Sequence, residues 1–233
     1  MADGEAGATP QPKKSDLGVR TLSAMVMLTV TGALLWLGGL WWTLFAVTVG
    51  FGVIREWVKL VGGFIPSAPG RFGWAVAGAM YCGLAVTMLI GLRQAGIGDV
   101  LRIVGAVIAT DIGAYFAGRT FGGPKIAPKI SPSKTWAGLI GGILGASLVF
   151  AISQSGAGSN LPETIVASLM AGSLLAIVAQ TGDFFESWMK RRADVKDSGQ
   201  LIPGHGGLFD RVDGLLAVLF VMAIAMLATR GLG

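Results

Sequence analysis

Charge is scarce in this sequence of 233 residues: only 13% are Asp, Glu, Lys or Arg, whereas 53% are hydrophobic. A soluble domain usually carries about 25% charged residues, because polar side chains must cover its surface. Mean hydropathy is +0.68. The shortage of charge argues against an ordinary soluble domain, and the long apolar runs indicate an integral membrane protein.

Cysteine and histidine are nearly absent, with one of each, Cys82 and His205. A single cysteine forms no internal disulfide, and one sulfur is too few for a zinc–thiolate site. Because Cys82 lies inside an apolar run, we interpret it as a small residue that packs between helices. The 37 glycines are scattered through apolar stretches, where small residues let membrane helices approach closely.

The basic residues are concentrated in a few short connecting segments. A net charge of +5 would indicate nucleic-acid binding only if basic and aromatic residues formed one surface, and no stretch has that pattern. We therefore expect no nucleic-acid partner. Clusters of Lys and Arg in short loops instead set membrane orientation, with the basic loops on the cytoplasmic side.

Seven apolar segments each approach the ~20 residues that a helix needs to cross a bilayer. The predicted fold is all-α, a polytopic transmembrane helix bundle of about seven spans. A polar tail at 1–18 precedes a transmembrane domain at 19–233, and the loops at 119–135 and 183–211 lie with the amino terminus on the cytoplasmic side. The segments cover 20–38, 40–61, 72–92, 99–118, 136–153, 163–183 and 208–229.

The stretch from Gly182 to Gly214 carries the densest group of opposed charges. Its first part continues the sixth apolar segment, and spacing of i, i+3, i+4 and i+7 puts four polar side chains on one helical face. Two aspartates share a face where the seventh segment begins. Ionisable side chains beside membrane spans are costly and usually mark function. The residues are Asp183, Glu186, Ser187 and Lys190, followed by Asp210 and Asp213.

This pattern is typical of Mg²⁺-assisted phosphoryl chemistry. Mg²⁺ is commonly held by one or two carboxylates and substrate phosphates, while cationic side chains bind the remaining oxygens. A tight turn at 203–207 can present backbone N–H groups to a phosphate. Each part alone has a plainer interpretation: a basic flank of a span at 190–196, a turn histidine at His205, and a surface salt bridge between Asp210 and Arg211.

A second polar region runs from Asp111 to Thr135. Asp111 falls within the fourth predicted span, where a carboxylate needs a partner. Glycines and prolines from Gly122 onward interrupt the helix and predict a loop over the membrane surface. The loop offers cations and hydroxyls to phosphate oxygens, although such a loop also attracts anionic headgroups nonspecifically. It lacks the GxxxxGK[ST] spacing of a Walker loop. These residues are Lys125, Lys129, Ser131, Ser133, Lys134 and Thr135.

At this point the sequence resembles a known family. The run SWMKRRADVKDSGQLIPGHGGLFDRVD, from Ser187 to Asp213, is similar to the signature of phosphatidate cytidylyltransferases, or CDP-diacylglycerol synthases. The segments DIGAYFAGR and ISPSKTW also resemble the family, so the resemblance is specific over 111–214. Two features depart from it: Ala137 stands where the family usually has an acidic residue, and the chain is shorter than many members.

The resemblance implies transfer of CMP from CTP to phosphatidate, giving CDP-diacylglycerol and pyrophosphate in phospholipid biosynthesis. It implies a bacterial inner (cytoplasmic) membrane with the active site facing the cytoplasm, and a homodimer by analogy alone. By motif position Asp183 and Asp210 would bind Mg²⁺, and the family is also described with K⁺. Catalytic candidates are Lys190, Arg191, Lys196, Asp197, His205, Arg211 and Asp213; substrate-binding candidates are Asp111, Tyr115, Lys125, Ser131, Lys134, Thr135, Ser187, Gly206 and Gly207.

Two other functions remain open from the sequence. A CTP-dependent transferase acting on an isoprenoid lipid would need a similar set of charges. An ion-coupled transporter could use Asp111, Asp183 and Asp210 as a cation path. A transporter would place its acidic residues near the bilayer midplane and between internal repeats, whereas these residues gather at one predicted membrane face.

Overall fold

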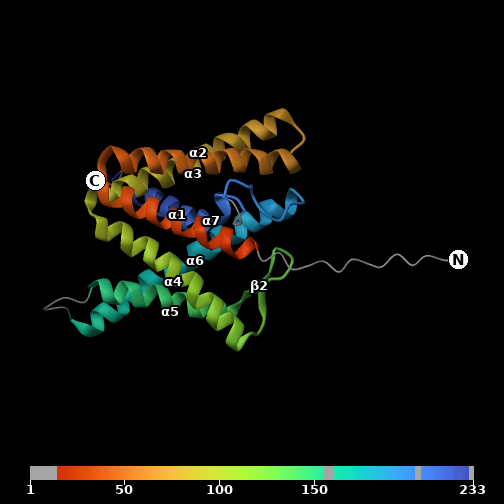
Figure 1. Cartoon of the computed structure of the whole chain (residues 1–233). Coiled ribbons are helices and arrows are strands. Elements are labelled where there is room, and N and C mark those ends of the chain that lie inside the picture. The colour runs from red at the N-terminus through yellow and green to blue at the C-terminus, as the bar shows by residue number, and fades with distance from the viewer. Residues whose placement is uncertain (1–14, 155–159, 203–205, 231–233) are drawn as a thin grey trace.

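The computed structural model describes residues 15–154, 160–202 and 206–230, and seven helices account for most of them. Each helix corresponds to one predicted span, so the predicted order of elements is confirmed. The sixth helix continues beyond its predicted span, as the shared face of polar residues required. The helices are α1 Ser15–Leu37, α2 Gly39–Phe64, α3 Ala68–Ala95, α4 Ile97–Phe121, α5 Trp136–Gln154, α6 Leu161–Arg192 and α7 Phe209–Arg230 (Figure 1).

Six of these helices, α1 and α3 to α7, are long and apolar enough to cross a membrane. The 26-residue helix α2 is not among them. Its length would suffice, but its second half carries Arg55, Glu56 and Lys59. The protein is therefore an all-α polytopic bundle, and the count of seven spans stays a prediction.

The connection between α4 and α5 differs from the predicted loop, because part of it forms a β-hairpin. Strand β1 (Lys125–Ala127) pairs antiparallel with β2 (Ser131–Thr135). Gly122 and Gly123 adopt φ of 61° and 90°, a left-handed conformation that glycine tolerates and that ends α4. Strands this short and polar have no alternating apolar pattern, so the sequence did not signal them.

Helices α4 and α5 approach each other backbone to backbone. A Cβ added at Gly141 would lie 2.5 Å from the carbonyl oxygen of Gly113. A Cβ at Gly142 would lie 3.0 Å from the Thr110 side chain. Close approach through small residues is how membrane helices pack, and Cys82, fully buried in the core, has the packing role predicted for it.

An aromatic core fixes the start of α7 against α2, α3 and α6. The Trp57 indole donates a hydrogen bond to the Trp74 carbonyl oxygen over 2.9 Å. Its ring contacts four others at centroid distances of 5.4 to 6.0 Å, those of Trp74, Tyr81, Phe185 and Phe209. Because Phe209 begins α7 and is fully buried, this core sets how α7 enters the bundle.

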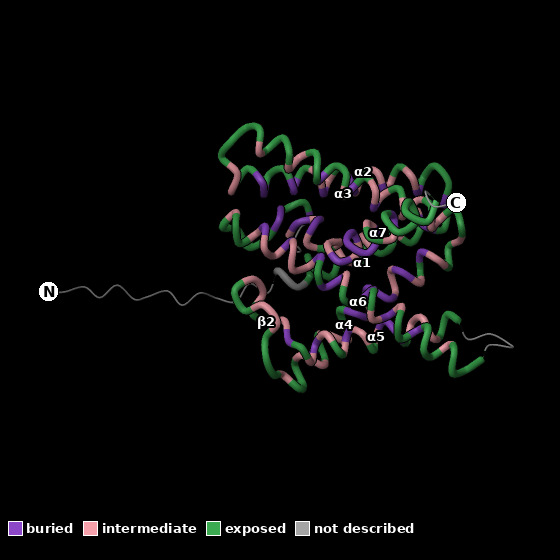
Figure 2. The backbone as a smooth tube through the Cα atoms, turned by 180° about the vertical axis from the view of Figure 1, so that it is seen from behind, coloured by how far each residue is buried: buried purple, intermediate pink, exposed green. Residues whose placement is uncertain are grey.

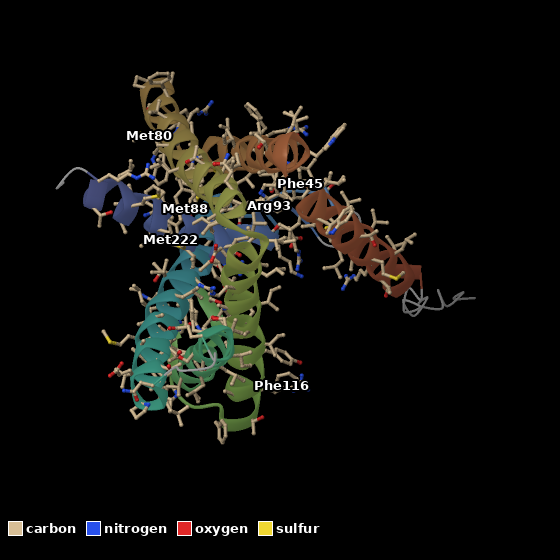
Figure 3. The ribbon with its side chains drawn as sticks, turned by 90° about the vertical axis from the view of Figure 1, so that its left-hand side faces the viewer. Phe45, Met80, Met88, Arg93, Phe116 and Met222 are labelled. Carbon is tan, nitrogen blue, oxygen red and sulfur yellow. The ribbon has the colours of Figure 1, made fainter. Side chains whose placement is uncertain are left out.

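Arg93 of α3 ties the far end of α1 to the bundle. Its guanidinium donates to the carbonyl oxygens of Leu35 and Trp36 over 2.7 and 3.2 Å. Figure 3 shows Arg93 near Phe45 at this junction, with α1 projecting away from the other helices. Figure 2 shows buried residues mainly where helices face one another, and exposed ones along outer faces, as expected for helices surrounded by lipid.

The β-hairpin, the α2–α3 connection and the start of α7 lie at the same end of the bundle (Figure 1). We term this the site end. The α1–α2 and α3–α4 connections lie at the opposite end. Both polar regions singled out in the sequence therefore meet at one end of the molecule.

Candidate active site

A cavity of about 720 Å³ opens at the site end between α4, α5, α6, α7 and the hairpin. Residues from both polar regions of the sequence line this cavity. Small residues on α4, α5 and α7 leave it open between the helices. The candidates that line it are Asp111, Tyr115, Lys125, Lys134, Thr135, Asp183, Lys190, Asp210 and Asp213.

Three carboxylates form a compact acidic cluster in the wall of this cavity. Asp183 and Glu186 lie one turn apart on α6, and Asp213 reaches them from the first turns of α7. One oxygen from each lies within 4.8 Å of the others. Ser187 adds a hydroxyl that donates to Asp183 over 3.4 Å. Clustered carboxylate oxygens match the ligand preference of a hard divalent cation.

Lys190 lies between two buried carboxylates. Its Nζ is 2.5 Å from Glu186 Oε2 and 2.7 Å from Asp210 Oδ1. The Glu186 side chain is 1% exposed and that of Lys190 15% exposed. This ion triad connects the last turns of α6 to the start of α7, so the cation is fixed in place beside the acidic cluster.

Asp210 also holds the segment that precedes α7. Its Oδ2 accepts hydrogen bonds from the Ser198 backbone N–H, the Ser198 hydroxyl and the Gly207 N–H, each 2.9 Å long. Gly206, the residue before Gly207, has a backbone φ of 84°, a conformation that favours glycine. The predicted metal ligand Asp210 is thus engaged with Lys190 and backbone amides, while the compact cluster contains its neighbour Asp213.

The hairpin is attached to α6 through Lys134, which forms an ion pair with Asp183. Thr135 is buried, and its hydroxyl accepts a 3.0 Å hydrogen bond from the Gly138 N–H. That bond caps the first turn of α5. At the mouth of the cavity, the Tyr115 hydroxyl accepts a 2.9 Å hydrogen bond from Arg119. Lysine, guanidinium and hydroxyl groups therefore line the same cavity as the acidic cluster.

Glu56 of α2 is a site residue that the sequence reasoning missed. Its carboxylate accepts hydrogen bonds from the Ser198 hydroxyl over 2.9 Å, the Leu208 N–H over 3.0 Å and the Phe209 N–H over 2.8 Å. The side chain is buried. The signal in the sequence was an acidic residue within an apolar helical segment, where an ionisable side chain is costly. The Ser198 hydroxyl has one proton, which Glu56 and Asp210 share at equal distances of 2.9 Å, and the two carboxylates together hold the backbone before α7.

Replacing Glu56 with glutamine should loosen this segment. Both carboxylate oxygens of Glu56 accept hydrogen bonds from N–H or O–H groups, so the NH₂ of a glutamine would face another donor. At least one buried group would then lack a partner, which costs about 1–3 kcal/mol. We expect a lower midpoint of thermal unfolding, faster tryptic cleavage after Lys196, and at least about tenfold lower turnover. Lys59→Gln, one turn away and exposed, is the matched control. Wild-type cleavage and turnover in Glu56→Gln would show that Glu56 does not position the site.

The other candidate site residues that the structure describes do not line this cavity. Ser131 lies at the start of β2, and Gly207 takes part through its N–H. His205 lies outside the described residues. The exposed candidates around the connection from α6 to α7 are Arg191, Lys196, Asp197 and Arg211.

A bundle of apolar helices with an acidic cluster, fixed lysines and a hydroxyl-bearing hairpin at one end is chemically suited to a phosphate-bearing substrate. The chain belongs to the cytidylyltransferase family, whose profile matches residues 67–229. This confirms the resemblance seen in the sequence.

Curated relatives match along nearly the whole chain. The phosphatidate cytidylyltransferase of Brucella suis is 36% identical, with 87% of this chain and 90% of the relative covered. That of Rickettsia bellii is 35% identical, with 88% of each chain covered. That of Rickettsia felis is 32% identical, with 91% of this chain and 94% of the relative covered.

Proposed function

We propose that this protein transfers CMP from CTP to phosphatidate, producing CDP-diacylglycerol and pyrophosphate. The observation that carries the proposal is the single cavity in which Lys134 and Lys190 meet the cluster of Asp183, Glu186 and Asp213. The names of the relatives, which match along almost their full length, support phosphatidate as the lipid substrate. An isoprenoid substrate or ion transport finds no comparable support.

We infer that Mg²⁺ binds where Asp183 of α6 faces the carboxylates of α7. The set of Asp183, Glu186 and Asp213 fits, because one oxygen from each lies within 4.8 Å of the others and the described lining of the cavity has more carboxylates than lysines. The cation, when bound, would neutralise charge on the reacting phosphates. Asp183 belongs both to the pair predicted by motif position and to the cluster; Asp210 and Asp213 are the alternatives for the second ligand. K⁺ is expected from the family alone.

The reaction joins two polyanions, so positioning and charge neutralisation dominate. A phosphate oxygen of phosphatidate attacks the α-phosphorus of CTP, and the bond from that phosphorus to the oxygen bridging to the β-phosphate breaks. Pyrophosphate leaves with that oxygen. A phosphomonoester with a second pKa of about 6 is mostly dianionic at neutral pH, so no general base is required. Lys134 and Lys190 would hold the phosphates, and Arg119, Lys125 and Tyr115 would bind at the mouth.

The site end faces the cytoplasm in this proposal. The hairpin and the last turns of α6 carry Lys125, Lys129, Lys134 and 190–192 there, whereas Arg93, Arg102 and Arg230 lie toward the other end. This asymmetry follows the positive-inside rule with seven spans and a cytoplasmic amino terminus. We place the protein in a bacterial inner membrane, like the family, with CTP arriving from the cytoplasm. A homodimer is proposed by analogy only.

The lipid would enter sideways between helices. Its phosphate lies at headgroup depth by the acidic cluster, while its acyl chains remain in the bilayer. The outward face of α4 is apolar, and Figure 3 shows Phe116, which is 63% exposed, pointing away from the bundle. This arrangement explains why a nucleotide-transferring site lies in a membrane protein.

The proposal is tested with purified protein in detergent–phosphatidate micelles supplied with CTP and Mg²⁺. We expect CDP-diacylglycerol in the organic phase, its loss when EDTA removes the metal, and recovery on adding excess Mg²⁺. Substituting a polyprenyl phosphate for phosphatidate should give little product. Folded protein that forms no CDP-diacylglycerol, or that works equally well in EDTA, would contradict the proposal.

A further inference from the structure

Gln180 of α6 is a buried amide that the reaction described above does not use. It lines the same cavity as the acidic cluster and is 5% exposed. Within the described part of the chain, neither its Nε2 nor its Oε1 has a hydrogen-bond partner. A buried polar group without a partner is costly, so a group that enters the cavity and pairs with it would bind more tightly.

The depth of Gln180 indicates which part of a ligand it meets. It precedes Asp183 by three residues on α6, which corresponds to about 4.5 Å along the helix axis, away from the site end. The lysines that would hold phosphates, Lys134 and Lys190, contact Asp183 and Glu186, on the site-end side of Gln180. A nucleotide arriving from water meets these cations first, whereas the glycerol of a lipid lies on the membrane side of its own phosphate.

Among the described lining residues of this cavity, the one aromatic ring is that of Tyr115, on the site-end side of Asp111 in α4, and small residues line it beside Gln180. Gly138 of α5 and Gly214 of α7 line the cavity with it, and a Cβ at Gly142 would lie 3.5 Å from its Nε2. A cavity wall of small residues around one amide suits a glycerol ester better than a nucleobase, which proteins usually bind by stacking and several hydrogen bonds. Just below its phosphate, a diacylglycerol offers ester carbonyls, which accept hydrogen bonds.

We propose that Gln180 donates from Nε2 to an ester carbonyl of the lipid substrate and thereby selects a diacyl lipid over ether and isoprenoid phosphates. The inference rests on the proposed transfer to phosphatidate. Gln180 is a specificity residue in this scheme: it touches the substrate away from the reacting phosphates, so its loss should affect the choice of lipid more than turnover itself.

The test compares dioleoyl phosphatidate with its dialkyl ether analogue, which has the same chains and phosphate but no carbonyls. We expect the wild-type protein to favour the ester about tenfold in kcat/KM, the value of one hydrogen bond. In Gln180→Met, which nearly preserves side-chain volume, the ester-to-ether ratio should fall to about 1, with the ether rate little changed.

Thr110→Val is the matched control. Thr110 is fully buried beside Gly142, but its hydroxyl donates within α4 to the Ala106 carbonyl oxygen over 2.9 Å. Its replacement should leave the ester-to-ether ratio at the wild-type value. A purely structural role for Gln180 would lower both rates together and also leave the ratio unchanged.

Two results overturn the inference: a wild-type protein that uses both lipids equally, which is decisive even if Gln180→Met does not fold, or a folded Gln180→Met protein that keeps the preference. Wild-type protein that transfers CMP to neither lipid would instead overturn the proposed function, and the inference with it.

Discussion

Asp183→Asn is expected to lower CMP transfer about 1000-fold while leaving the protein folded. Among the described residues, Asp183 is the carboxylate that belongs both to the compact acidic cluster and to an ion pair with the hairpin. The substitution preserves shape but removes the negative charge needed to hold a divalent cation and to orient Lys134. Loss of preorganised electrostatic stabilisation typically costs factors of 10² to 10³, and here two such interactions fail together.

The measurement is turnover of purified protein, combined with Mn²⁺ binding followed by electron paramagnetic resonance. Asp99→Asn is the control, since Asp99 lies in the first turn of α4, paired with Arg102 over 3.6 Å and outside the cavity wall. Comparing Asp210→Asn with Asp213→Asn in the same binding assay identifies the second ligand. A folded Asp183→Asn protein with wild-type turnover would exclude the metal assignment.

Lys190→Met is expected to abolish activity and also to destabilise the protein. The substitution leaves Glu186 and Asp210 facing each other, largely buried, without the cation that lies 2.5 and 2.7 Å from them. Removing one partner of a buried ion pair costs about 3–5 kcal/mol, and here one cation serves two carboxylates. The melting temperature in detergent should therefore fall clearly below that of the wild type.

A double variant separates stability from catalysis. Adding Glu186→Gln to Lys190→Met removes one of the two unpaired charges, so much of the lost stability should return. Turnover should not return, because the fixed cation is still absent. A Lys190→Met protein with wild-type melting temperature would show that the ion triad contributes little, and recovered turnover in the double variant would show that Lys190 does not act on substrate.

The helices could be predicted from sequence because each predicted span is a long apolar run, and the structure places a helix over every one. The extension of α6 to Arg192 followed from the helical spacing of Asp183 to Lys190. The β-hairpin could not be predicted in this way, since its pairing depends on glycines in left-handed conformations and on contacts with α4 and α5 rather than on periodicity.

The site was predictable where polar residues are close in sequence and less so where they meet only in space. The structure brings Lys134 and Asp183 together from two separate motifs. Glu56 was missed because its partners, Ser198, Leu208 and Phe209, lie more than 140 positions away. The role of Asp210 in holding the segment before α7 was also not predictable from sequence. Its place in the metal site stays a prediction.

The central claim, that CMP rather than phosphate is transferred from CTP to the lipid, is tested most directly by position-specific labelling. Purified protein is incubated with phosphatidate, Mg²⁺ and CTP carrying ³²P at either the α- or the γ-phosphate. Transfer of CMP predicts that α-label moves into the organic phase while γ-label stays in the aqueous phase as pyrophosphate. Entry of γ-label into the lipid, or of neither label with folded protein, would contradict the claim.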